Sequence, residues 1–336
     1  MKKYLIATVT VVLLVAFLAG CADGNATAAG GTAQAPDPIS IGALQIGDHL
    51  ALDEARRGFV SGMADLGWVI GENFNFTYFS AQGDISVAHT MAVQIVENDP
   101  DLILGIATST SQALANTTED IPIVITAVTN PLLADLVESF ERPGRNVTGT
   151  SDMSPVADQF ELLVRLLPDA QTIGIIYNAG EVNSHILADM AREKARELGL
   201  DYITVTVAST ADVAQATESI VGRVDVIYTP TCNTVASAIP VIVAIADENG
   251  VPIIGGNEGH VFQGALATEG VNYYRLGRQA AVMAGEILRG ENVPAEMPIQ
   301  WQEEFNLVIN MSQAERLGIE ISADVLDEAD NLFVEE

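Results

Sequence analysis

From residue 39 onward, short apolar runs alternate with stretches in which apolar residues recur every three or four positions. The runs predict buried strands and the stretches predict amphipathic helices. In the first half, the predicted strands are Ile39–Ile46, Phe74–Phe79, Leu102–Ile106 and Ile121–Ala127, and the predicted helices are Asp53–Leu66, Ser86–Glu97 and a short one after Ala107–Ser111. This alternation predicts a parallel sheet covered by helices on both faces.

A second series of the same kind begins after the break at Arg142–Arg145 and an extended segment, Asn146–Thr150. Its predicted strands are Ile173–Tyr177, Tyr202–Val207, Val224–Tyr228 and Pro252–Ile254, and its predicted helices are Pro155–Leu167, Ser184–Leu198, Ala211–Val221 and Val235–Asn249. Two series of similar length predict two similar α/β lobes. A helix, Tyr273–Arg289, and a strand, Phe305–Ile309, follow, but periodicity does not assign them to a lobe.

The stretch Ile173–Ser184 is a strand, a polar loop and the start of a helix, for which Asn183 or Ser184 is a suitable N-cap. Ligands of open α/β sheets bind beyond the carboxyl ends of the strands. The helix amides and dipole there favour an anionic group such as a carboxylate, which we expect near Asn183 and Ser184. Alternatively, this is an ordinary turn.

Four predicted strand ends carry small hydroxyl or amide residues. They are Thr108–Thr110, Thr129–Asn130, Asn178–Ser184 and Thr229–Thr234. Each group alone could simply cap the next helix. Together they favour a cleft that orients a small polar ligand without breaking bonds in it.

The N-terminus predicts a lipoprotein signal. Lys2 and Lys3 precede an apolar run, Tyr4–Leu18, and Leu-Ala-Gly-Cys ends at Cys21. We expect residues 1–20 to be removed, Cys21 to carry the lipid and residues 21–38 to form a flexible tether. The alternative is an uncleaved anchor, but the run is shorter than the roughly 20 residues that a membrane span needs.

Charge and cysteine content exclude several classes of partner. The chain has 45 acidic and 15 basic residues and a formal charge of −30. Nucleic acid would be repelled, so we expect no nucleic-acid partner, and the acidic excess is consistent with a saline habitat. Cys21 and Cys232 are the two cysteines, so no internal disulfide is expected, and the four histidines lack metal-ligand spacing. We expect neither a metal nor another cofactor.

Signatures of the common enzyme classes are missing from the sequence. It has no G-x-S-x-G nucleophile elbow, no G-x-G-x-x-G fingerprint and no Walker A lysine. Cys232 has no histidine near it in the sequence, which favours an unreactive loop cysteine over a nucleophile. The sequence therefore predicts a binding protein and not an enzyme.

Several segments together resemble ABC-transporter substrate-binding lipoproteins of the tryptophan/tyrosine-uptake type. The resemblance covers the chain from about Ile39 to Ile319. It is carried by Ile41–Gln45, Ile121–Val124, Ala127–Pro131, Asn146–Gly149, Tyr177–Ser184, Thr231–Ala238, Gly264–Thr268, Tyr274–Gln279 and Asn306–Asn310.

The resemblance implies a type I periplasmic-binding fold, in which two Rossmann-like lobes with parallel sheets are joined by three crossovers. It places the crossovers near 146–152, 267–270 and 303–310. The first lobe would then comprise 39–145 and 270–302, and the second 146–269 and 303–336.

It also implies an extracytoplasmic solute-binding lipoprotein of an ABC importer. Such a protein is anchored to the membrane by the lipid on Cys21 and delivers a small polar solute, for example an aromatic or branched amino acid, to a permease and its ATPase. We expect a monomer. The alternative is a ligand-sensing protein of the same fold coupled to a membrane signalling partner.

The candidate ligand-binding residues combine the strand ends with the resemblance. They are Gln45, Thr108, Ser109, Thr110, Thr129, Asn130, Tyr177, Glu181, Asn183, Ser184, Thr231, Cys232, Asn233, Thr234, Asn257 and Glu258. No catalytic or metal-binding residues are predicted.

The chain departs from the family at three of these positions. Asn130, Cys232 and Asn257 stand where acids are usual or common in the family, yet an α-ammonium group in a closed cleft needs a carboxylate. Either Glu181 or Glu258 supplies it, or the ligand is not a standard amino acid. On this basis, Cys232→Asp is expected to tighten amino-acid binding.

Overall fold

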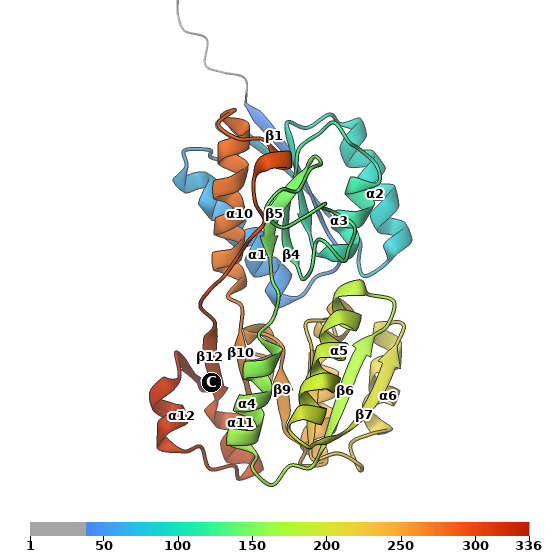
Figure 1. The fold of residues 1–336 in the computed structure, drawn as a ribbon, viewed down its shortest axis with the longest axis vertical. Coiled ribbons are helices and arrows are strands. Elements are labelled where there is room, and N and C mark those ends of the chain that lie inside the picture. Colours follow the sequence, from blue (N-terminus) through green and yellow to red (C-terminus); the bar gives the residue numbers. More distant parts are fainter. Residues whose placement is uncertain (1–37, 336) are drawn as a thin grey trace, which may run out of the picture. The chain divides into compact units, whose positions relative to one another are not determined.

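The computed structural model describes residues 38–335, so the predicted signal peptide, Cys21 and nearly all of the predicted tether lie outside the described part. The described chain forms two sheets (Figure 1). The first lobe is built on six parallel strands in the order β11-β5-β4-β3-β1-β2. These strands are β1 (Ile39–Gln45), β2 (Phe74–Ser80), β3 (Leu102–Ile106), β4 (Ile123–Val128), β5 (Val147–Ser151) and β11 (Gln300–Trp301).

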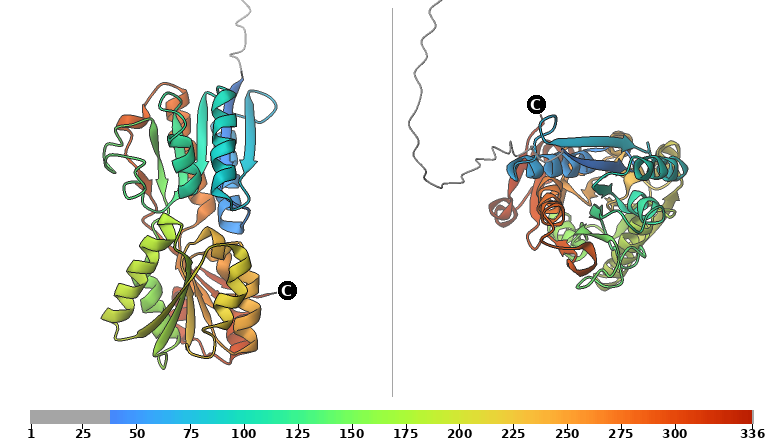
Figure 2. Two further views of the ribbon diagram at one scale, coloured as in Figure 1. Left: turned by 90° about the vertical axis from the view of Figure 1, so that its right-hand side faces the viewer. Right: turned by 90° about the horizontal axis from the view of Figure 1, so that it is seen from above.

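Helices cover both faces of this sheet (Figure 2). They are α1 (Leu50–Asp65), α2 (Ile85–Glu97), α3 (Thr108–Ala115) and α10 (Tyr273–Leu288). The α1–α10 pair packs so closely that a Cβ at Gly277 would collide with the carbonyl oxygen of Ala55. Gly277 therefore allows α10 to pack closely against α1. This helix comes from late in the chain but lies on the first lobe, as the resemblance implied.

The second lobe contains seven strands in the order β13-β12-β10-β9-β8-β6-β7. The β10–β12 pair is antiparallel and the other pairs are parallel. The strands are β6 (Thr172–Asn178), β7 (Asp201–Val207), β8 (Val226–Thr229), β9 (Ile253–Gly255), β10 (Ala267–Gly270), β12 (Asn306–Asn310) and β13 (Asn331–Phe333). The helices are α4 (Val156–Leu166), α5 (Val182–Glu197), α6 (Val213–Glu218), α7 (Asn233–Ala236), α8 (Ile239–Glu248), α9 (Glu258–Val261), α11 (Met311–Leu317) and α12 (Ala323–Glu328).

The second lobe has a core on each face of its sheet. Ile175 and Tyr177 of β6 belong to one core, and Ile176 between them belongs to the other. This explains why the strand is an unbroken apolar run and does not alternate, because a parallel sheet is buried on both faces. The two sheets and their helices confirm the expected fold class.

The chain passes between the lobes at three places: from β5 to α4, from β10 to α10 and from β11 to β12. The predicted boundary at residue 146 put β5 in the second lobe, whereas β5 pairs with β4 of the first. We therefore find that the chain leaves the first lobe after Ser151, at Asp152.

Three local expectations differ from the structure. The helix expected over Val235–Asn249 is divided into α7 and α8, since Pro240 can start a helix but cannot continue one. α5 begins at Val182 with Glu181 in the N-cap position, so the expected N-caps Asn183 and Ser184 lie inside the helix. In place of the helix expected over Ala211–Val221, a 3₁₀ turn precedes a shorter α6.

Candidate ligand-binding site

Residues from both lobes and from two crossovers surround a small buried cavity of about 10 Å³. The first lobe contributes His49, Leu52 and Ala127, the crossovers contribute Asp152 and Tyr273, and the second lobe contributes Asn183, Thr231, Cys232, Asn233, Ala236 and Asn257. A larger groove of about 660 Å³ shares Asn233 with this cavity and is lined by Ser109, Glu181 and Thr234, among others. The two form one candidate site at the facing strand ends, which we call the interlobe cleft.

We call the smaller space of about 10 Å³ the deep cavity. Asp152 is the acidic residue that lines it, and this side chain is 4% exposed. Its Oδ2 accepts a hydrogen bond from the Tyr273 hydroxyl at 2.6 Å, and its Oδ1 accepts one from the Thr129 hydroxyl at 2.9 Å. Burial raises the pKa of the Asp152 carboxyl above its usual range, although these two hydrogen bonds act in the opposite direction. Among the described residues that line the cavity, none is a lysine or arginine. A ligand cation would therefore stabilise the ionised carboxylate.

Two further acceptors lie at the same cavity without a partner. Asn183 Oδ1 and Asn257 Oδ1 are buried and accept no hydrogen bond from any described residue. Asn183 Nδ2 donates to the Thr231 carbonyl at 3.0 Å, which fixes the amide so that its oxygen is the free group. Leaving such acceptors unsatisfied costs free energy, so the cavity favours a ligand that carries several N–H donors.

The first turn of α3 offers hydrogen-bond donors, whereas the deep cavity offers acceptors. Thr108, Ser109 and Thr110 are buried, no side chain caps the helix, and Thr108 Oγ1 has no partner among the described atoms. The N–H groups of a first helical turn have no intrahelical acceptor and favour an anion. The turn lies beside the cavity, because Ala107 N–H donates to the Thr126 carbonyl next to cavity-lining Ala127.

Both strand ends at this turn have unusual backbone geometry. Ala107 has a φ of 84° and Ala127 a φ of 57°, in the left-handed region that residues with a side chain rarely adopt. Strained backbone of this kind concentrates at ligand-binding positions. Ala107 directly follows β3 and Ala127 is the next-to-last residue of β4, and both shape the first-lobe wall of the cleft.

Glu181 is buried but is already satisfied within the second lobe. Its carboxylate accepts hydrogen bonds from the backbone and side chain of Asn233, from the backbone and side chain of Thr234, and from Ser184 Oγ. Asn183 Nδ2 and Cys232 Sγ lie 3.5 and 3.6 Å from its oxygens. A carboxylate with this many donors has little remaining capacity to bind a ligand's ammonium group.

Comparison with known proteins identifies the class of this site. The family described as ABC transporter substrate binding protein matches residues 40–333. The curated tyrosine-binding protein of Clostridioides difficile (strain R20291) is 37% identical over 327 residues, covering 96% of this chain and 94% of that protein.

Two solved structures also match 88% of this chain and 100% of their own. One, from Streptococcus pneumonia in complex with L-Trp, is 34% identical with a TM-score of 0.86. The other, a ligand-free, open substrate binding protein with adhesive properties from Clostridium difficile, is 38% identical with a TM-score of 0.67. This chain belongs to the ABC transporter substrate-binding proteins.

The family assignment favours substrate binding over the alternative of ligand sensing, and it confirms the expected type I periplasmic-binding fold. Substrate-binding proteins of ABC transporters work outside the cytoplasm with a membrane permease. Within residues 38–335, no helix combines the length and the apolar character needed to cross a membrane.

The structure brings about half of the predicted site residues to the interlobe cleft. Asn183, Thr231, Cys232, Asn233 and Asn257 line the deep cavity, and Ser109, Glu181 and Thr234 line the groove. The remaining candidates line neither space. Some are held by contacts of their own: Gln45 donates to Asp53 Oδ1 and the Gly47 carbonyl, Thr110 to the Ile106 carbonyl, and Asn130 caps Leu133 N.

Glu258, the second candidate acid, faces a different cavity. That cavity, of about 240 Å³, lies between the starts of α1 and α10 and the short helix α9. Glu258 Oε1 accepts a hydrogen bond from Asn306 Nδ2 at 2.6 Å, and burial raises the pKa of its carboxyl. Glu258 therefore does not line the cavity that contains Asp152, although Tyr273 lines both cavities.

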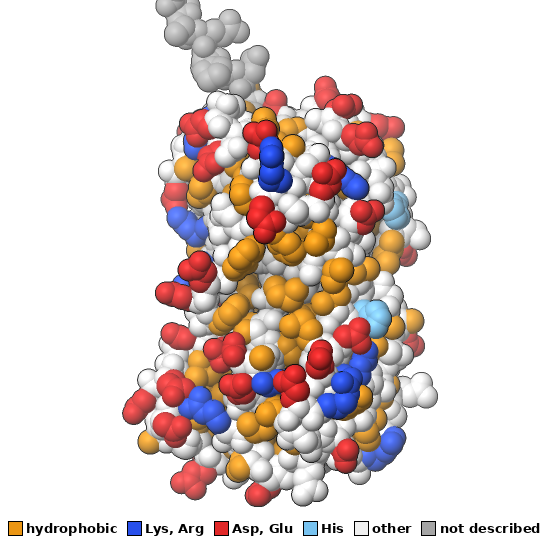
Figure 3. Space-filling model, in the orientation of Figure 1, with side chains coloured by type: hydrophobic (Ala, Val, Ile, Leu, Met, Phe, Trp, Pro, Cys, Tyr) orange, Lys and Arg blue, Asp and Glu red, His pale blue; other side chains and the backbone are white. Residues whose placement is uncertain are grey.

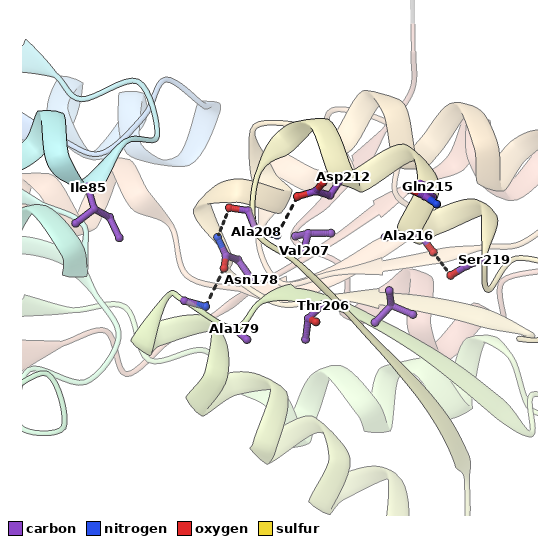
Figure 4. A pocket seen from close by; sticks show the side chains of 12 residues that line it. Ile85, Asn178, Ala179, Thr206, Val207, Ala208, Asp212, Gln215, Ala216 and Ser219 are labelled. Carbon is purple, nitrogen blue, oxygen red and sulfur yellow. Dashed lines mark hydrogen bonds between the residues drawn. The ribbon is translucent and has the colours of Figure 1, made fainter.

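Another groove, of about 750 Å³, lies on the second lobe along β7 and α6 (Figure 4). It is lined by Asn178, Ala208 and Asp212, with Ile85 contributed by the first lobe. Asn178 to Gly180 of the predicted polar strand end line this groove, but none of the unpartnered buried oxygens of the described chain does. It is less suited than the interlobe cleft to hold a polar solute.

Sequence reasoning missed Asp152, Tyr273 and His49 as residues of the site. Asp152 and Tyr273 are 121 positions apart and meet because each begins the segment after a crossover strand. The sequence carries a signal for Asp152, because this residue directly follows β5 and is a polar residue at a strand end, like the four groups predicted to form the cleft.

Proposed function

We propose that this substrate-binding protein captures an α-amino acid in the interlobe cleft, with the α-ammonium group against Asp152. The observation that carries the proposal is the deep cavity, where one buried carboxylate and two unpartnered amide oxygens converge without a neighbouring arginine or lysine among the described lining residues. An ammonium group supplies one positive charge and three N–H donors, which matches these acceptors.

The α-carboxylate would then bind at the first turn of α3, through its backbone N–H groups and Ser109, which lines the groove. The sequence favoured the α5 end near Asn183 and Ser184. The Glu181 carboxylate lies 3.3 Å from Ser184 Oγ and would repel an anion there. The α3 turn has no such acid in its hydrogen-bond contacts and is the better anion site.

An aromatic amino acid is the best-supported side-chain class. Relatives with similarity along nearly the whole chain are described as a tyrosine-binding protein and as a complex with L-Trp. The deep cavity is too small for a ring, so the side chain would extend toward the groove of about 660 Å³.

The cellular setting completes the proposal. We infer that Cys21 carries a lipid that holds the monomeric protein at the outer side of the membrane, that an ABC permease and its ATPase receive the solute, and that no residue acts catalytically. Replacing Cys21 with Ser should release the protein from the membrane fraction.

The ligand class can be tested without prior assumptions. Native mass spectrometry of the purified protein would reveal a co-purified solute, and titration calorimetry with the twenty standard amino acids would rank them. We expect L-tyrosine or L-tryptophan to bind most tightly. A co-purified sugar, or no binding by any amino acid, would overturn the proposal.

A further inference from the structure

A chain of polar contacts crosses from the second lobe to the first, next to the deep cavity. His49, which precedes α1, places Nε2 3.2 Å from Asn233 Oδ1 at the start of α7. Asn233 Nδ2 in turn donates to Glu181 Oε2 at 2.8 Å. The two lobes also come close together at Gly47 of the first lobe, where a Cβ would lie 3.8 Å from Ser237 Oγ of the second.

The Glu181 carboxylate determines which way the Asn233 amide faces. A carboxylate accepts hydrogen bonds and donates none when ionised, so the NH₂ group of Asn233 must point toward it. The amide oxygen is thereby left to face His49. If the Asn233 amide were rotated by 180°, its oxygen would face a carboxylate oxygen of Glu181 and its N–H groups would face His49.

The orientation of Asn233 then decides the tautomer of His49. Because Asn233 Oδ1 can only accept, His49 Nε2 must carry the proton in the neutral ring. Burial lowers the pKa of His49, although Asn233 and the acids Glu181, Asp53 and Asp48 act in the opposite direction. The neutral ring with its proton on Nε2 is therefore the form that this environment favours.

We propose that Glu181, Asn233 and His49 form an interlobe latch that sets how far the lobes close, with Glu181 as a positioning residue. In this role Glu181 acts on ligand binding through Asn233 and does not touch the ligand's ammonium group. His49 contributes the donor on the first lobe. The inference rests on the proposed function only in assuming that the lobes close over a solute.

The latch can be tested in the unliganded full-length chain, so that its failure is separate from failure of the ligand assignment. Small-angle scattering reports lobe opening, and ¹⁵N NMR of the imidazole nitrogens reports the tautomer. Four histidines give signals, and His49→Gln identifies those of His49. Thr117→Ala is a matched control, since its hydroxyl bonds within the first lobe to the Ala113 carbonyl.

We expect the wild type to show His49 protonated on Nε2. His49→Ala should shift the balance of closed and open forms about fivefold toward open, the typical effect of one lost hydrogen bond, and increase the radius of gyration. His49→Gln, which can still donate, should restore the wild-type radius. Glu181→Gln should move the His49 nitrogen signals although His49 itself is unchanged, and Thr117→Ala should change neither readout.

Three results would overturn the latch. One is a wild-type His49 protonated on Nδ1. Another is a set of His49 signals that stays in place in Glu181→Gln. The third is an unchanged radius of gyration in His49→Ala. Because the NMR comparison needs only the folded Gln variants, it decides the question even if His49→Ala does not fold.

Discussion

Asp152 illustrates how a binding residue can carry a cost in the unliganded protein. It is buried with hydrogen bonds from Tyr273 and Thr129 but has no cationic partner among its described contacts. Burial raises its pKa, so the folded state holds the proton to higher pH than the unfolded chain, in which an aspartate titrates near about 3.9. The stability that this proton contributes is therefore fully present below that value and is lost as pH rises through the raised pKa.

Ligand binding should consequently be linked to the proton on Asp152. A bound ammonium group favours the ionised carboxylate, so binding releases a proton when the solution pH lies below the raised pKa. We expect affinity for an amino acid to fall by up to about tenfold per pH unit in that acidic range. Calorimetry in two buffers of different ionisation enthalpy measures the released proton. Binding without proton release down to about pH 4, near the unperturbed value, would contradict this role for Asp152.

A substitution at Cys232 tests whether the site can hold a second carboxylate beside Glu181. The sequence suggested that Cys232→Asp would supply a missing acid and tighten binding. The structure places Cys232 Sγ 3.6 Å from Glu181 Oε1 in a buried position, where a second carboxylate would be repelled. We now expect Cys232→Asp to lose several kcal/mol of stability with no gain in affinity, and Cys232→Ser to be close to neutral. Urea unfolding measures both; a stable Asp variant with tighter binding would favour the original expectation.

At the scale of elements, strands were predictable from local sequence but the site was not. Apolar runs such as Leu102–Ile106 identified the sheets because parallel strands are buried on both faces. The split of α7 from α8 was detectable in principle from Pro240, but the N-cap role of Glu181 was not, since glutamate is not a favoured cap. The meeting of Asp152 with Tyr273 depends on two crossovers and cannot be deduced from periodicity.

The strained end of β3 predicts an unusual glycine effect. Ala107 has a φ of 84° and a ψ of 159°, a combination that glycine adopts readily and alanine does not. We expect Ala107→Gly to raise the free energy of unfolding by about 1 kcal/mol. The matched control is Ala244→Gly on the exposed side of α8, which should lower it by about 1 kcal/mol. A loss of stability in both variants would show that Ala107 is not strained.

For the whole molecule, charge is the dominant surface feature. Acidic side chains are spread over both lobes on the face shown in Figure 3, with fewer basic ones between them. The chain has 45 acidic and 15 basic residues, so the negative charges within one folded molecule repel one another at low ionic strength and destabilise the compact state. Salt screens this repulsion, with a Debye length of about 10 Å at 0.1 M and about 3 Å at 1 M.

Stability should therefore rise with salt. We expect the thermal midpoint to increase by several degrees between about 0.1 and 1 M potassium chloride, the range over which screening becomes nearly complete. Differential scanning calorimetry at neutral pH measures it. A midpoint that stays constant or falls would exclude surface repulsion as a significant term and would remove the physical support for a saline habitat.

The central claim is that Asp152 binds the ammonium group of an amino acid. It is tested most directly by measuring how much of the binding free energy of the ammonium group depends on the Asp152 carboxylate. Calorimetry would give the affinities of the wild type and Asp152→Asn for L-tyrosine and for 3-(4-hydroxyphenyl)propionate, which lacks the amino group. We predict that the wild type prefers tyrosine by at least about a hundredfold, as expected for a buried charged pair, and that the variant loses most of this preference. A variant that discriminates between the two as strongly as the wild type would contradict the claim.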